Sequence, residues 1–336
     1  MNVRRVLRPA PHLERHPVQH GLLVLLGAAL ALGATVGVAW AAGFGTVLHT
    51  LKHPNLPWLA VAFGSEVLAY VGYAVAYREL VRAGGGPVLG FRRASAIVAA
   101  GFGVFVIRGG FVVDRAALET AGVAPREARV RVLGLGALEY AVLAPAACAA
   151  ALVLLARHAT HPSLGFTLPW AVAVPVGFIG AFGILALRSR VGTAGFWRSA
   201  FHHALDAIEI LPRLLTRPTA RGLAFLGAAV YWFGDITALW AALRVFGEEP
   251  SLPALVIGYA TGYALTRRTL PLGGAGSVEA LVAFALAWTG TKLAPAVLAV
   301  FAYRIFNLWL PLLPAALGLR TLKGLRRTAW RAARAP

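Results

Sequence analysis

The segment 252–319 reads LPALVIGYATGYALTRRTLPLGGAGSVEALVAFALAWTGTKLAPAVLAVFAYRIFNLWLPLLPAALGL. Polar side chains interrupt its apolar runs, and a break rich in proline and glycine, residues 271–276, divides it. Charged side chains and irregular backbone are costly at membrane depth, so they tend to mark a pathway or a binding site. We therefore expect such a site in this segment. The polar residues concerned are Arg267, Arg268, Glu279, Arg304 and Asn307.

The composition identifies the class of protein. Of the 336 residues, 59% are hydrophobic and 13% are charged, and the apolar runs are long and continuous. This composition predicts a polytopic α-helical membrane protein. The formal net charge of +19 lies mainly in the loops, so it does not indicate nucleic-acid binding. The lone Cys148 excludes an intramolecular disulfide.

The chain divides into three parts. A basic cytoplasmic arm, residues 1–20, precedes a single transmembrane domain, residues 21–319, and a basic cytoplasmic tail covers residues 320–336. We interpret the first apolar run as a retained helix, because it lacks a convincing cleavage site. The loop 188–221 has apolar residues spaced three and four apart, which predicts an interfacial amphipathic helix. The full spans are expected at about 21–42, 56–77, 132–156, 168–187, 222–243 and 294–319.

Two further segments are apolar but broken. Residues 94–107 are too short to cross a hydrocarbon core that needs about 20 residues, and an arginine and two glycines follow them. Residues 253–290 share this plan of short limb, arginine, glycine break and second limb with an acid. We predict two re-entrant hairpins beside six full spans, or eight helices if the hairpins cross. The likeness is weak residue by residue, but two opposed breaks suggest an inverted repeat.

The distribution of basic residues predicts the orientation. Most of the 32 Lys and Arg residues lie in the arm, the tail and the segments 78–93, 108–131 and 188–221. The opposite loops hold only Lys52, Arg157, Arg244 and Lys292. Because cytoplasmic loops are rich in Lys and Arg, both termini are expected in the cytoplasm, with the protein in the inner (cytoplasmic) membrane.

The site residues suggest recognition of phosphate. Guanidinium groups bind phosphate through paired hydrogen bonds, and a helix that starts after a glycine break directs free N–H groups at an anion. The alternative is structural: Arg304 would form an ion pair with Glu279, Asp235, Glu139 or Glu66, and the glycines would allow close helix packing. The expected site consists of Arg304, Arg267, Arg268, Arg108, Gly273, Gly274, Gly276, Glu279, Asn307, Tyr303, Gly109, Gly110, Asp114 and Arg115.

The run LPLGGAGSVEALV, followed by a helix and AYRIFNLWLPLLPAALG, resembles the flippase-like family named for the membrane region of lysylphosphatidylglycerol synthases. RGGFVVDRAAL is similar to that family's Gly-Gly-x-x-x-Asp-Arg segment. The resemblance covers nearly the whole chain and implies movement of a lipid or a lipid-linked headgroup between leaflets. The matching residues are Pro271, Gly273, Gly274, Gly276, Glu279, Tyr303, Arg304, Trp309, Leu310, Pro311, Gly109, Gly110, Asp114 and Arg115.

The synthases carry a soluble aminoacyl-transferase domain after the membrane region, whereas about 17 residues follow the last predicted helix here. Aminoacylation is therefore not expected. The leading hypothesis is a lipid translocase that acts on anionic or phosphate-bearing lipids, with no cofactor, no metal and no catalytic motif.

Two alternatives remain. One is a membrane-embedded transferase acting on a lipid or polyprenyl phosphate, for which the acids are Asp206 with Glu209 or Asp114 with Glu119. The other is a membrane subunit that works with a separate lipid-modifying enzyme. Metal-dependent turnover of a lipid substrate would favour the transferase, and co-purification with a partner would favour the subunit.

Overall fold

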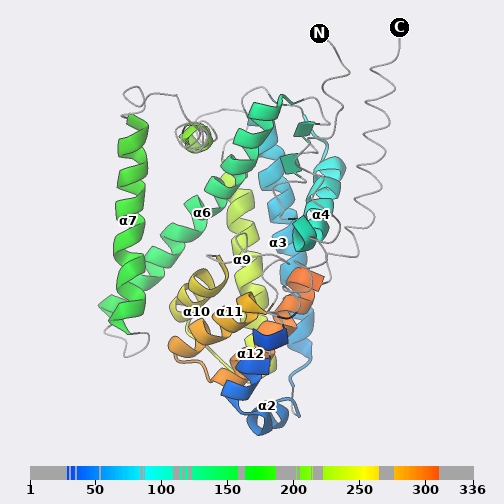
Figure 1. Ribbon diagram of the computed structural model, residues 1–336, viewed down its shortest axis with the longest axis vertical. Coiled ribbons are helices and arrows are strands. Elements are labelled where there is room, and N and C mark those ends of the chain that lie inside the picture. Colours follow the sequence, from blue (N-terminus) through cyan, green and yellow to red (C-terminus); the bar gives the residue numbers. More distant parts are fainter. Residues whose placement is uncertain are drawn as a thin grey trace.

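The computed structural model describes residues 32–52, 54–83, 88–108, 123–157, 163–186, 222–264 and 276–309 apart from a few single positions, and short pieces within 114–119 and 202–214. Every regular element in this described part is a helix, which confirms the predicted all-α fold (Figure 1).

Four helices are long and apolar enough to cross a membrane. They are α3 (Pro57–Arg82), α6 (Pro125–Ala156), α7 (Leu164–Ala186) and α9 (Leu223–Val245), and each coincides with a predicted span. The described end of the first predicted span, residues 32–42, meets α2 (Phe44–Thr50) at a bend of 85°. The last predicted span begins as α12 (Leu293–Arg304) and η7 (Ile305–Trp309). The total number of crossings remains a prediction.

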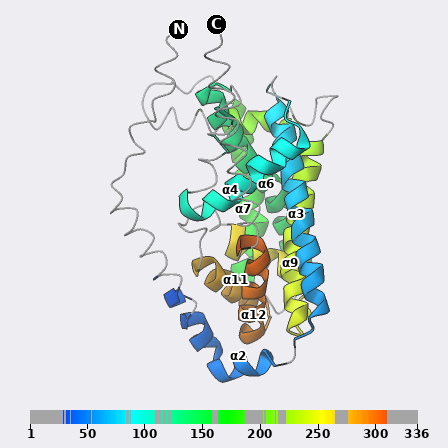
Figure 2. The same ribbon diagram turned by 90° about the vertical axis from the view of Figure 1, so that its right-hand side faces the viewer.

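Helices α3 and α9 pack closely against each other and run side by side along one edge of the molecule in the view of Figure 2. A Cβ atom on Gly72 would lie only 2.7 Å from the backbone oxygen of Gly227. A Cβ atom on Gly234 would lie 2.6 Å from the backbone nitrogen of Ala69. Small residues therefore allow the two backbones to approach closely, as is common between membrane helices.

Helix α7 lies at the edge of the molecule and packs against α6, which runs obliquely towards it (Figure 1). Thr167 is the one residue of α7 that is buried. Phe166 and Trp170 near its start pack against the core, whereas apolar side chains further along, such as Val176, Ile179 and Phe182, are exposed and available to lipid.

The second broken segment has the short limbs that its sequence predicts. Helix α10 (Leu252–Tyr259) continues into the π-helix η5 (Ala260–Ala264), and α11 (Ser277–Trp288) follows the break. The limbs pack tightly, since a Cβ atom on Gly262 would lie 2.5 Å from the Cα of Val282. As far as the structure describes them, to Ala264 and from Ser277, neither limb reaches the roughly 20 residues of a full span.

The first broken segment is only partly described. Its first limb is α4 (Phe91–Arg108), an 18-residue helix that begins three residues before the predicted limb. Gly109 and Gly110 lie outside the described residues. The predicted resemblance between the two breaks therefore stays a prediction.

The described residues of the loop 188–221 include a helical stretch, 205–212. Leu205 and Ala207 are buried, and Asp206 lies 3.5 Å from Arg126 at the start of α6. This part of the predicted amphipathic helix therefore packs against protein as well as facing its surroundings. The rest of that helix lies outside the described residues.

Candidate functional site

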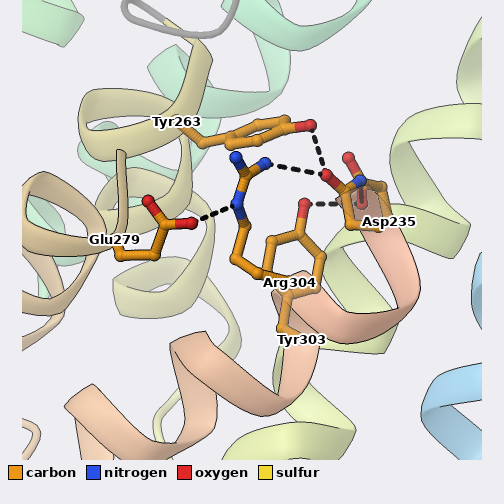
Figure 3. A network of polar contacts seen from close by, with 6 residues as sticks. Asp235, Tyr263, Glu279, Tyr303 and Arg304 are labelled. Carbon is orange, nitrogen blue, oxygen red and sulfur yellow. Dashed lines mark hydrogen bonds and ion pairs between the residues drawn. The ribbon is translucent and has the colours of Figure 1, made fainter. Parts of the chain in front are cut away.

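A buried ion pair joins the second limb of the broken segment to α12 (Figure 3). The Arg304 Nε donates to Glu279 Oε1 at 2.8 Å, and the two residues are only 2% and 6% exposed. Glu279 lies in the first turn of α11, directly after Gly276, whose φ of 80° few other residues adopt. The glycine thus starts the helix that brings the carboxylate to Arg304.

Asn307 connects this ion pair to the central helices. Its Oδ1 accepts from Arg304 Nη1 at 3.1 Å and from the Tyr263 hydroxyl at 2.9 Å. Its Nδ2 donates to Asp235 Oδ1 at 2.9 Å and to Glu66 Oε1 at 3.2 Å. A side-chain amide offers two donors and two acceptor sites, so Asn307 is fully used.

The Asp235 carboxylate on α9 is completely buried and is held by neutral donors among the described residues. Tyr303 donates to its Oδ1 at 2.7 Å, and Tyr259 donates to its Oδ2. Tyr231 is a further donor at 3.5 Å. Such hydrogen bonds compensate part of the cost of removing a carboxylate from water.

Two π-helical turns flank the network. Tyr263 belongs to η5, Asn307 belongs to η7, and their side chains are hydrogen-bonded to each other. A π-turn breaks the regular α-helical ladder and often occurs at functional sites. The helix α10–η5 and the helix α12–η7 therefore each bring a polar side chain to the same point.

Acidic groups outnumber basic groups in the described network. Glu66, Asp235 and Glu279 are connected through Asn307 and Arg304, which supplies the one guanidinium among these residues. Carboxylates close together repel each other most strongly where water is excluded.

The structure brings several predicted site residues together. Arg304, Glu279, Asn307 and Tyr303 all belong to the network, and Gly276 begins α11. Of the four acids considered as partners for Arg304, Glu279 forms the ion pair. Glu139 is buried on α6, where its backbone carbonyl accepts from the Trp232 indole.

The other predicted residues either lie elsewhere in the described part of the chain or fall outside it. Arg115 pairs with Glu119 at 2.6 Å, and Asp114 is buried nearby in the chain. The side chain of Arg108 lies outside the described residues. So do Arg267, Arg268, Gly109, Gly110, Gly273 and Gly274.

Apart from Tyr303, sequence reasoning missed the tyrosines of the network. Tyr259 and Tyr263 lie four residues apart, so they fall on one face of a helix. Two tyrosines at this spacing, just before the paired Arg267 and Arg268, were the sequence signal that could have indicated their place in the site. The sequence showed Asp235 and Glu66 as acids within apolar runs, but we considered them only as candidate ion-pair partners of Arg304.

A model of the family described as the lysylphosphatidylglycerol synthase TM region matches residues 24–315. None of the curated proteins compared with the chain matches it.

Proposed function

Because the chain belongs to the lysylphosphatidylglycerol synthase TM-region family, we propose that it moves a phospholipid, or a lipid-linked headgroup, between the two leaflets. The buried Arg304–Glu279 ion pair between α12 and α11 is the observation that supports this proposal most directly. A guanidinium at membrane depth is costly to bury, and its retention there supports a role in binding a headgroup phosphate.

The proposed site works by exchange of partners at Arg304. In the described structure the Arg304 guanidinium donates to Glu279 Oε1. The other carboxylate oxygen, Glu279 Oε2, has no hydrogen-bond partner among the described residues. A headgroup phosphate would replace Glu279 and take two parallel hydrogen bonds from Arg304. Arg267, Arg268 and Arg108 are proposed to accompany the phosphate, while the acyl chains stay in lipid.

We place the arginine-rich end of the molecule on the cytoplasmic side of the inner membrane. Arg82 at the end of α3 and Arg126 and Arg129 in the first turns of α6 support this orientation. Membrane lipids are then the expected partners. If the transported lipid is a modified one, a separate lipid-modifying enzyme would supply it.

The first prediction concerns transport. Reconstituted protein should move fluorescent phospholipids, and the rate should fall about tenfold or more in Arg304→Ala, since a charge-assisted bidentate contact is lost. Movement is measured by dithionite quenching of the label in the outer leaflet of proteoliposomes. Arg157→Ala, at the exposed end of α6, is the matched control and should transport normally.

Arg304→Ala also leaves the buried Glu279 unpaired, which costs about 3–5 kcal/mol of stability. The double variant Arg304→Met with Glu279→Gln removes both charges and separates folding from transport. We expect it to fold and not to transport. Wild-type rates in this folded variant would exclude Arg304 as the phosphate contact.

A further inference from the structure

A separate cavity lies at the end of the molecule where α9 finishes and α12 begins. Its volume is about 480 Å³, and it is bounded by α2, by the turn after α9 and by the first residues of α12. This volume is within the range of small-ligand sites. The polar and charged residues that line it are Thr46, Thr50, Glu248 and Lys292.

Helix α2 presents two different faces at this cavity. Thr46 and Thr50 line the cavity, whereas Phe44 and Leu48 are 52% and 62% exposed. Leu51 continues the exposed apolar face one turn later. A short helix with such faces, joined by a bend of 85° at Gly43 to the described end of the first predicted span, suits the layer between headgroups and acyl chains.

The cavity carries charges of both signs. Lys292 precedes the first turn of α12, where backbone N–H groups have no acceptor within the helix. Glu248 follows Gly247 in the turn after α9 and also lines the cavity. Neither Lys292 nor Glu248 forms an ion pair with another described residue, so both charges are available to a ligand.

We propose that this cavity binds a phospholipid headgroup that carries a phosphate and a primary ammonium. Lys292 and the start of α12 contact the phosphate, and Glu248 contacts the ammonium. The acyl chains lie beside Phe44 and Leu48, which gives those exposed side chains an apolar neighbour. This is a site of binding, separate from the Arg304 network.

Equilibrium binding tests the proposal without any need for transport. Full-length protein in detergent is titrated with dioleoylphosphatidylethanolamine and with dioleoylphosphatidylglycerol, and bound lipid is counted by native mass spectrometry. Lys292→Gln should weaken binding of both lipids about threefold to fivefold, the size of one partly exposed ion pair. Glu248→Gln should weaken phosphatidylethanolamine alone, because phosphatidylglycerol has no ammonium.

Arg157→Gln is the control for loss of a basic residue elsewhere in the loops and should bind both lipids as the wild type does. Wild-type affinity in Lys292→Gln would overturn the site. Displacement of lipid by an equal concentration of free phosphoethanolamine would overturn the lipid assignment in favour of a soluble ligand. A protein that binds as expected but fails to transport would disprove only the proposed function.

Discussion

At the scale of single residues, Asn307 connects elements that are far apart in the chain. Its amide links Arg304 on one side to Asp235 and Glu66 on the other, and a hydroxyl from η5 completes its contacts. All of these groups are buried, so the loss of the amide leaves each of them short of a partner. The residue therefore controls both the stability and the charge distribution of the network.

We predict that Asn307→Leu lowers the free energy of unfolding by about 2–4 kcal/mol, because each unsatisfied buried polar group costs about 1–3 kcal/mol. Thermal unfolding of detergent-purified protein measures the effect. Asn55→Leu is the matched control, since Asn55 is exposed near the start of α3, and it should change stability by less than about 0.5 kcal/mol. Equal stability of the two variants would contradict the central role of Asn307.

At the scale of elements, the α3–α9 pair is the support on which Glu66 and Asp235 are held. Gly72→Ala should destabilise the protein by about 1–3 kcal/mol, because the new methyl group would lie 2.6 Å from the backbone nitrogen of Tyr231. Gly64→Ala on the same helix has open space around it and serves as the control. The yield of monodisperse protein after heating reports the difference. If Gly72→Ala withstood heating as well as Gly64→Ala, the close approach of α3 and α9 would not contribute to stability.

The elements also show how far sequence reasoning reaches. Long apolar runs predicted α3, α6, α7 and α9 because length and hydropathy alone decide whether a helix can span a bilayer. The same measure could not distinguish α7, which lies at the edge, from α9, which is largely buried. Lipid and protein interior are equally apolar, so burial among helices leaves little trace in hydropathy.

The candidate site was predictable in part for a related reason. Arg304, Glu279 and Asn307 stand out because polar groups are rare in apolar runs. A polar group at that depth needs a polar partner, so the three residues were expected in one site. The choice of Glu279 over the three other acids depends on the break before α11 and on the π-turn of η7. The break was visible in the sequence as a run rich in proline and glycine, whereas the π-turn is set by packing and leaves no local signal.

At the scale of the whole molecule, we predict the orientation in the membrane from where the basic residues gather. Arg129 lies near the start of α6, and Glu249 follows the end of α9. The start of α6 and the end of α9 lie at opposite ends of the molecule (Figure 1). Both side chains are exposed. The positive-inside rule predicts that Arg129 lies in the cytoplasm and Glu249 outside.

Sided labelling measures this directly, because Cys148 is the only cysteine and is buried. In a Cys148→Ala background, Glu249→Cys should react with a membrane-impermeant maleimide in intact spheroplasts. Arg129→Cys should react only after the membrane is opened. The reverse pattern would invert the topology, and it would move the cavity beside Lys292 to the cytoplasmic leaflet. Since a phospholipid bound there belongs to whichever leaflet the cavity faces, this one experiment also fixes the leaflet in which a bound headgroup would begin or end its passage.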